Sequence, residues 1–429
     1  MKRILLRAIS LILVVITLGF CLVGCKNDEE NESDSGAWTN DFSDVVLGLG
    51  DSSDSETADT KKEDATTKPT EKQTEPTPGK STTTANLIKT EYNLKQKSSL
   101  FKLVGRTKFT SEGIYFDQSA AAIEFQGYMT GDVLLTASSE GDTFYTVYVD
   151  GKRTSPTSIG SERDKYKVTG GMSKETTIKL ASFEGKYFHH IRVIKQSEPS
   201  QSYSTLKKLT ITGKLEGTPA NKKYYIEFYG DSLTAGYSNI ADGSKSAPHA
   251  AKWQDATQTY AFMAAEELGA DCSILAKSGT GLARGYTDDY NNNLWNYFSK
   301  YSYRRGSEAF NFSGVRKPNL VVIHLGANDY ANGASKDKFV SKGKELVDKI
   351  KNGYGAIPII WAYDPGEKVS TAWMEEIVNY YKNTHKGQTA MISLEWRSKG
   401  KVNGHPNVAG HKKNCSELVA LIKEKGFLK

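Results

Sequence analysis

The stretch Tyr225–Gly236 reads YIEFYGDSLTAG, and it decides which fold to expect. Its first half is an apolar run with the length of a buried strand, and Gly-Asp-Ser-Leu follows at once. In parallel sheets, residues directly after a strand end lie at the edge where substrates bind. The segment therefore makes Ser232 a candidate nucleophile, and it points to the loops after other strands for its partners.

Strand and helix patterns alternate from Lys222 onward. Near-continuous apolar strands separated by helices are typical of a parallel sheet covered on both faces. The pattern predicts an α/β domain over residues 219–429, with three α/β/α layers and the reactive residues at the carboxyl ends of the strands. The predicted strands are Tyr225–Tyr229, Cys272–Ala276, Leu320–Leu325, Ile357–Trp361 and Ala390–Leu394.

A serine hydroxyl needs donors aimed at the oxyanion that its attack creates. Two blocks after predicted strands can supply them, Ser278–Gly281 (SGTG) and Leu325–Asp329 (LGAND). The candidate donors are the backbone amide of Gly279 or Gly281, the Asn328 side chain and the Ser232 amide. Asp329 is expected to be structural, bonding loop amides.

His405 is the candidate general base, since Pro406-Asn407 and a following helix would fix its loop. A solvent-exposed loop histidine is the competing interpretation, as a helix N-cap is for Ser232. Four blocks in the same chain order favour the catalytic interpretation over both. His411, on the C-terminal helix, is expected behind the site or on the surface.

Composition excludes several function classes. The 429 residues carry a formal charge of +6, and no Lys/Arg stripe interleaves with aromatic residues, so we expect no nucleic-acid partner. No His/Cys/Glu cluster has metal-ligand spacing and no glycine-rich loop has the form that binds a nucleotide, so we expect no metal and no cofactor. Cys272 and Cys415 stand in apolar surroundings and are expected in the core rather than in a disulfide framework.

The N-terminus has the layout of an export signal. Basic residues precede the apolar run Ile9–Phe20, and Leu-Val-Gly-Cys, ending at Cys25, resembles the lipobox of bacterial lipoproteins. The resemblance implies a signal peptide over residues 1–24, lipidation of Cys25 and anchoring on the extracellular face of a bacterial membrane. An ordinary signal peptide is the alternative, and the protein is exported under either interpretation.

Two regions separate this signal from the α/β domain. Residues 25–95 are polar, with few large apolar side chains, and are predicted to be a disordered linker. Ser52 follows Gly-Asp there, but no strand precedes it, so we assign it no role. Residues 96–218 alternate with period two between Gly, Asp and Ser residues, which predicts an all-β sandwich. Within it, Tyr148–Lys152 contains an Asp-Gly pair typical of a tight hairpin.

The four blocks resemble those of the SGNH, or GDSL-type, hydrolases, from Tyr224 to the C-terminus. The β-sandwich ahead of them, together with Trp253–Thr257 (WQDAT) and Leu275–Leu282 (LAKSGTGL), is similar to carbohydrate esterase family 2. This resemblance implies a jelly-roll domain ahead of the catalytic domain. It also implies a serine esterase that removes O-acetyl groups from plant polysaccharides such as xylan or glucomannan.

One departure from the family pattern concerns the acidic residue that orients the histidine. Superfamily members usually carry an Asp three residues before it, and family 2 members two before it, but this chain has Val402 and Asn403 there. Some family 2 relatives work with a Ser-His dyad in which a backbone carbonyl holds the imidazole, and this is the simplest interpretation. The side chains of Asn403, Glu395 or Asp364 are the alternatives.

Aromatic side chains near strand ends can form a platform for a sugar ring. Trp361 is the preferred candidate, followed by Trp253, with core packing as the alternative for each. The expected protein is a monomeric esterase acting on an acetylated polysaccharide or oligosaccharide. Rival hypotheses are a lipid esterase or O-acyltransferase with a wider pocket, and a carbohydrate-binding lipoprotein that has lost catalysis.

Overall fold

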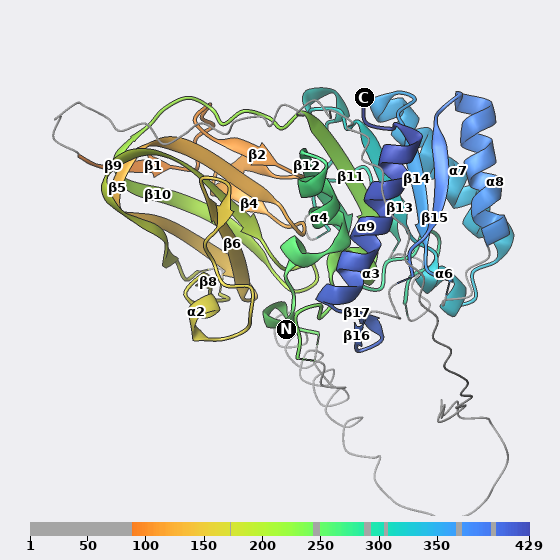
Figure 1. The fold of residues 1–429 in the computed structure, drawn as a ribbon, viewed down its shortest axis with the longest axis horizontal. Coiled ribbons are helices and arrows are strands. Elements are labelled where there is room, and N and C mark those ends of the chain that lie inside the picture. Colours follow the sequence, from red (N-terminus) through yellow and green to blue (C-terminus); the bar gives the residue numbers. More distant parts are fainter. Residues whose placement is uncertain are drawn as a thin grey trace, which may run out of the picture. The chain divides into compact units, whose positions relative to one another are not determined.

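A parallel sheet forms the centre of the C-terminal part of the computed structural model (Figure 1). The structure describes residues 88–171, 173–242, 249–286, 293–303, 308–365, 371–395 and 400–429. In this part of the chain the sheet has five strands in the order β12-β11-β13-β14-β15, and every pair is parallel. They are β11 (Tyr224–Gly230), β12 (Ala270–Ala276), β13 (Leu320–His324), β14 (Ile359–Tyr363) and β15 (Thr389–Ser393). All five predicted strands are confirmed, with ends that shift by at most two residues.

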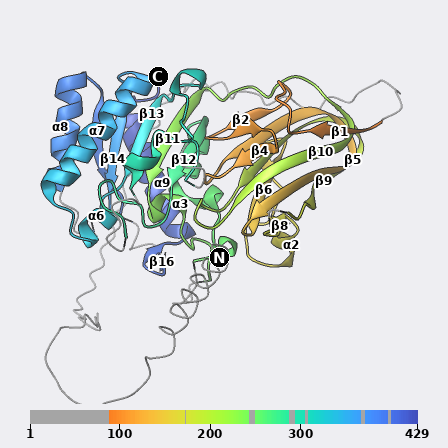
Figure 2. The ribbon, with the colours of Figure 1, turned by 180° about the vertical axis from the view of Figure 1, so that it is seen from behind.

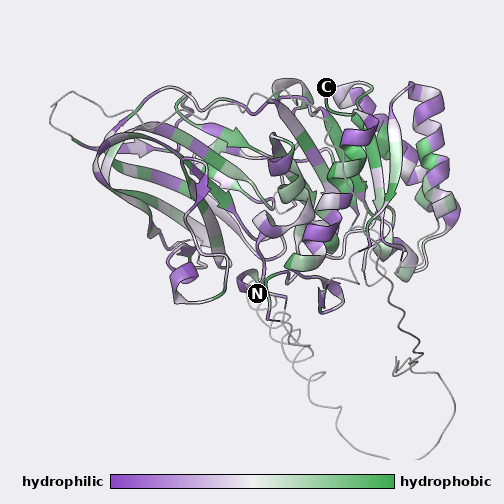
Figure 3. Cartoon of the chain, viewed as in Figure 1, coloured by the Kyte–Doolittle hydropathy of each residue, from purple (hydrophilic) through white to green (hydrophobic). Residues whose placement is uncertain are grey.

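Helices cover both faces of this sheet, as the apolar strands predict. Alternate side chains of β11 go to opposite faces, so Phe228 packs in one core cluster and Tyr229 in another. Helices α4 (Tyr260–Glu267) and α9 (Val408–Lys425) cover the first face, and α7 (Lys336–Tyr354) and α8 (Thr371–His385) cover the second. Figures 1 and 2 show the two pairs from opposite sides, and Figure 3 shows the strands as the most hydrophobic elements. The predicted three-layer α/β/α architecture is confirmed.

An antiparallel sheet forms the N-terminal part of the described chain. Its order is β3-β4-β10-β5-β9-β6-β7, with β1 on β10, β2 on β5 and β8 on β6. The sheet is curled and encloses its own apolar core, as the alternating pattern predicts. The predicted end of the linker at residue 95 is wrong, because residues 89–93 form a strand that pairs with β10 and packs Tyr92 against this core. Its strands are β1 (Lys89–Asn93), β2 (Lys102–Val104), β3 (Lys108–Thr110), β4 (Gly113–Phe116), β5 (Ala122–Glu140), β6 (Thr143–Val149), β7 (Lys152–Arg153), β8 (Lys167–Val168), β9 (Thr176–Lys195) and β10 (Tyr203–Leu215).

Turn residues in this sheet behave in two ways. The predicted hairpin is confirmed: Asp150 and Gly151 have φ of 50° and 77° and join β6 to β7. In contrast, the runs at 122–125 and 132–137 belong to one strand, β5. Gly127 and Gly131, with φ of 157° and 61°, bend that strand instead of ending it, and the register against β9 and β10 shifts near Gly131.

The prediction that Cys272 and Cys415 are buried is confirmed, and burial raises their pKa values to about 12 and about 11. No helix within the described ranges is long and apolar enough to cross a membrane. The predictions for Cys25, for the signal peptide and for Ser52 lie outside the described residues.

Short helices connect the strands of both parts. They are α2 (Ser161–Asp164), α3 (Ser232–Ala235), α5 (Leu294–Tyr297), α6 (Ala327–Ala331), η1 (Ala251–Trp253), η2 (Ala256–Gln258) and η4 (Phe312–Gly314).

Candidate active site

Ser232 stands where β11 passes into α3. Asp231 caps the helix, because its Oδ1 atom accepts a hydrogen bond of 2.9 Å from the Leu233 amide. Gly230 permits the tight passage: a Cβ atom there would lie 2.1 Å from Thr234 Oγ1. These contacts fix the first helical residue, so Ser232 presents its half-buried hydroxyl at the carboxyl edge of the sheet.

His405 lies directly against this serine. Its Nε2 atom is 2.8 Å from Ser232 Oγ, and its Nδ1 atom is 2.8 Å from the backbone carbonyl oxygen of Asn403. A carbonyl oxygen can only accept, so this contact places the imidazole proton on Nδ1. Nε2 is then the basic nitrogen, free of a proton and facing the hydroxyl. This is the tautomer that a general base for Ser232 requires.

A two-residue turn orients the carbonyl of Asn403. Val402 and His405 are cross-strand partners in the small hairpin of β16 (Lys401–Val402) and β17 (His405–Pro406). Between them, Asn403 and Gly404 have φ of 48° and 70°, the left-handed pair of a type I′ turn. The contact expected of a dyad is therefore present at the position where family 2 members usually carry Asp. The Asn-Gly pair is the sequence signal that could have predicted the hairpin.

Asn328, one of the candidate oxyanion donors, lies beside the start of α3. Asn328 Nδ2 donates to the Thr280 carbonyl at 3.0 Å and to Asp231 Oδ2 at 3.2 Å, so it lies between the nucleophile turn and the glycine loop. Gly279 has φ of 77°, and a Cβ atom on Gly281 would lie 1.9 Å from the Arg284 carbonyl. Both positions therefore require glycine.

Asp329 organises the glycine loop. Its carboxylate accepts hydrogen bonds of 2.7, 2.7 and 2.8 Å from the amides of Leu282, Ala283 and Arg284. The predicted structural role is confirmed. Burial raises the pKa of Asp329 to about 6, while the three amides favour its charged form.

Two aromatic rings extend the site away from the serine. Tyr237 packs against His405, with ring centroids 4.5 Å apart, and against His249 on its other side, 4.8 Å away. His249 in turn contacts the carboxylate of Glu198, which lies on the antiparallel part of the chain. The sequence offers His249 only as a weaker alternative to His405 for the base, and Tyr237 and Glu198 were not candidates. Tyr237 follows the nucleophile by five residues and could have been found by proximity, whereas Glu198 carried no such signal.

The prediction that Trp361 forms a sugar platform is wrong. Its side chain has no exposed surface and packs against Phe339 in the core under α7 and α8. Trp253 is half-buried, with Lys252 Nζ 4.7 Å from its ring centre, and its binding role stays a prediction. Tyr286 is the exposed aromatic residue on the glycine loop: it is 63% exposed, and its amide donates to the Gly279 carbonyl at 2.8 Å.

Two buried histidines lie behind the site. His411 has no exposed surface and its Nδ1 atom accepts a 3.2 Å hydrogen bond from the Tyr260 amide. His324 Nδ1 is 3.2 Å from the Tyr260 hydroxyl, which also bonds Thr234 of the nucleophile helix at 2.8 Å. Burial lowers the pKa of His324 to about 4 and that of His411 to about 3, so both are neutral. His411 therefore lies behind the site rather than on the surface.

The described residues contain no group of three or more His, Cys, Asp or Glu side chains placed to hold a metal ion. Ser232 and His405 bring together a hydroxyl and an imidazole, and Asn328 adds an amide donor beside them. This set is suited to acyl transfer from an ester through a serine nucleophile.

Fold and site together define a hydrolase domain of the SGNH class. Residues 228–413 match the GDSL-like Lipase/Acylhydrolase family, so this domain of the chain is similar to the members of that family. The match begins in β11 and ends in α9, so it contains Ser232, Asn328 and His405.

Relatives that resemble the chain over both parts are esterases. The cellulase/esterase CelE of Acetivibrio thermocellus is 27% identical over 72% of this chain, which spans only 37% of the length of CelE. An acetylxylan esterase / glucomannan deacetylase of Cellvibrio japonicus is 25% identical over 80% of this chain and 93% of its own length. A solved family two carbohydrate esterase from Clostridium thermocellum, in complex with cellohexaose, superposes with a TM-score of 0.69. It is 26% identical and the match covers 76% of this chain and all of that one. The resemblance to family 2 carbohydrate esterases is thus confirmed.

Proposed function

We propose that this protein is a serine esterase that removes O-acetyl groups from a polysaccharide such as acetylated xylan or glucomannan. The observation that carries the proposal is the 2.8 Å contact between Ser232 Oγ and the Nε2 atom of His405. The Asn328 side chain near it, and a relative named as an acetylxylan esterase / glucomannan deacetylase, support the same reaction.

The reaction proceeds in two steps. Ser232 Oγ bonds to the acetyl carbonyl carbon as its proton passes to His405 Nε2, and the oxyanion is held by the amides of Ser232 and Gly279 or Gly281 and by Asn328. The bond from the acetyl carbon to the sugar oxygen then breaks, and Nε2 returns the proton to that oxygen. Water attacks the acetyl-serine, His405 takes and returns its proton, and acetate leaves with Ser232 restored.

The Asn403 carbonyl replaces the usual carboxylate in this mechanism. It fixes the ring and its tautomer, which supports a Ser-His dyad, but it carries only a partial charge. The imidazolium formed in each step is consequently stabilised less than by an ion pair. We therefore expect a working enzyme with a modest kcat.

The substrate class rests on the surface beside the dyad. Tyr286 is 63% exposed there, and an aromatic face suits the apolar face of a sugar ring. The solved relative in complex with cellohexaose supports a glycan as the class of substrate. On the sequence of residues 1–25, we further propose an exported lipoprotein that is anchored through Cys25. We expect this protein to act as a monomer.

Chain-length preference tests the proposal. Initial rates are compared for 4-nitrophenyl acetate, butyrate and octanoate, with acetylated xylan and glucomannan as polymeric substrates. A preference for acetate together with release from a glycan supports the deacetylase. A preference for octanoate would assign a lipid esterase instead, and glycan binding with no hydrolysis of any ester would leave a carbohydrate-binding protein.

A further inference from the structure

A buried carboxylate of the antiparallel part of the chain, that of Glu198, contacts a loop of the candidate active site. Glu198 follows β9 in the loop to β10, and it has no exposed surface. Its Oε2 atom accepts a hydrogen bond from the amide of Ser278, and its Oε1 atom accepts one of 2.7 Å from Ser278 Oγ. Ser278 directly precedes Gly279. One side chain of the sandwich thus holds the loop that is proposed to bind the oxyanion.

Two more donors complete the surroundings of this carboxylate. Gln254 Nε2 lies 3.1 Å from Oε1, and His249 Nε2 contacts the same oxygen. Because an ionised carboxylate only accepts, all four contacts suit the charged form of Glu198. Contacts with His249 and Ser278 keep the pKa of Glu198 below its ordinary value although burial alone would raise it.

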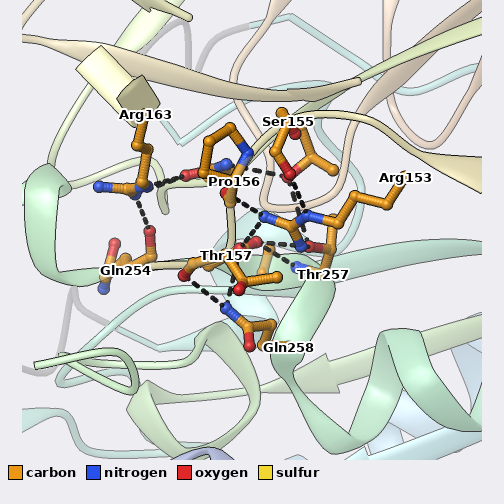
Figure 4. Close-up of polar contacts among 12 residues, drawn as sticks. Arg153, Ser155, Pro156, Thr157, Arg163, Gln254, Thr257 and Gln258 are labelled. Atoms are coloured by element: carbon orange, nitrogen blue, oxygen red, sulfur yellow. Dashed lines mark hydrogen bonds and ion pairs between the residues drawn. The ribbon is translucent and has the colours of Figure 1, made fainter. Parts of the chain in front are cut away.

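Neighbouring contacts hold the hydrolase segment that carries Gln254. Arg163 donates to the Gln254 and Lys252 carbonyls, both at 2.8 Å, and Arg153 donates to Asp255 Oδ2 at 2.7 Å (Figure 4). Both arginines belong to the antiparallel part. These two arginines and Glu198 thus form a polar junction between the antiparallel part and the hydrolase domain. Glu198 is the member of this junction that contacts a catalytic loop.

The same carboxylate also reaches the base through stacked rings. His249 packs on Tyr237 and Tyr237 packs on His405. Glu198 consequently contacts the oxyanion loop on one side and, through two rings, the imidazole on the other. A displacement of this side chain would move both halves of the machinery.

We propose that Glu198 is a positioning residue for the esterase reaction, and that the sandwich acts on catalysis by holding Ser278 and His249 through it. The inference rests on the proposed function. A misplaced oxyanion donor or base slows the chemical step rather than substrate binding. In E198Q an NH₂ group replaces one carboxylate oxygen, so it faces either the Ser278 amide at Oε2 or the three donors at Oε1. Because NH₂ cannot accept a hydrogen bond, the substitution should release the loop while changing little volume.

The test compares wild type, E198Q, S278A and K102M with 4-nitrophenyl acetate, together with amide hydrogen exchange over residues 277–283. Lys102 crosses the same junction to Asp271, near the opposite end of β12, with a 2.9 Å ion pair. K102M therefore loosens the junction away from the dyad. We expect E198Q to lower kcat about 10- to 100-fold, with KM within about threefold, and to speed exchange of the loop. K102M should lower the melting temperature about as much as E198Q does, but it should leave kcat unchanged.

Two results would overturn the inference: unchanged kcat and exchange in E198Q, or an equal loss of kcat in K102M. If E198Q does not fold, S278A takes its place in the test, because this substitution removes one donor to Glu198. S278A should then lower kcat and leave KM unchanged. If the wild type hydrolyses no ester, the proposed function fails, and faster loop exchange in E198Q but not in K102M still decides whether Glu198 holds the loop.

Discussion

The Nδ1 atom of His405 lies 2.8 Å from the backbone carbonyl oxygen of Asn403, two residues earlier in the chain. An orienting group is thereby supplied by the main chain of a hairpin turn and not by an acidic side chain. This has a direct consequence for mutagenesis, because a main-chain contact survives substitutions that the turn tolerates.

Substitutions in this turn should distinguish the role of the Asn403 carbonyl from that of the Asn403 side chain. Asn403→Gly keeps a residue suited to φ of 48°, so kcat should stay within about threefold of wild type. Gly404→Val introduces strain at φ of 70°, of about 1–2 kcal/mol, although no atom lies within 4 Å of its added Cβ. It should lower kcat by shifting the carbonyl. Loss of activity in Asn403→Gly equal to that in His405→Ala would instead assign the role to the Asn403 side chain.

Asn328→Ala should lower kcat by about 10²- to 10³-fold with little change in KM, because an oxyanion donor acts mainly in the transition state. Steady-state kinetics with 4-nitrophenyl acetate measure this. Asn332→Ala is the control, since Asn332 lies one turn later and donates to the Asn328 carbonyl at 2.8 Å. A variant Asn328→Ala with normal kcat would remove this residue from the proposed oxyanion hole.

Tyr286→Ala should weaken glycan binding and spare the chemistry. Loss of one aromatic face should raise KM for acetylated xylan about 3- to 10-fold, while the kinetics with 4-nitrophenyl acetate stay the same. Tyr187→Ala, a half-buried tyrosine of β9, serves as the matched control. Equal effects of Tyr286→Ala on both substrates would mean that this residue shapes the loop instead of binding sugar.

Acid should destabilise the protein through its buried histidines. The pKa values of His324 and His411 are lowered from 6.5 to about 4 and about 3, so between these values and 6.5 the unfolded chain binds more protons than the folded one. The free energy of unfolding should therefore fall as pH drops below about 6.5, by up to about 1.4 kcal/mol per pH unit for each histidine.

His411→Gln isolates one of these contributions and keeps an acceptor for the Tyr260 amide. Urea unfolding between pH 7.5 and 4.5 should show a smaller loss of stability in the variant than in wild type. The difference in the free energy of unfolding between the variant and wild type at pH 7.5 reports the change in packing alone, and it serves as the reference. Parallel curves for the two proteins would show that His411 is not held neutral by the fold.

The sequence predicted the features that depend on local pattern. The five parallel strands, the Asp150-Gly151 hairpin and the order of the blocks around Ser232 and His405 all follow from short-range periodicity and turn chemistry. The Trp361 prediction failed because both faces of a parallel sheet are covered, so a tryptophan inside such a strand is buried. Glu198 was missed because its contacts join residues 80 positions apart, across two parts of the chain.

Release of acetate from acetylated xylan and glucomannan, by wild type and by Ser232→Ala, tests the central claim most directly. We predict release by the wild type and a loss of about 10⁴-fold or more in the variant, whose circular dichroism should be unchanged. No release from either glycan by the folded wild type, or an equal rate in Ser232→Ala, would contradict the assignment of Ser232 as the nucleophile of a polysaccharide deacetylase.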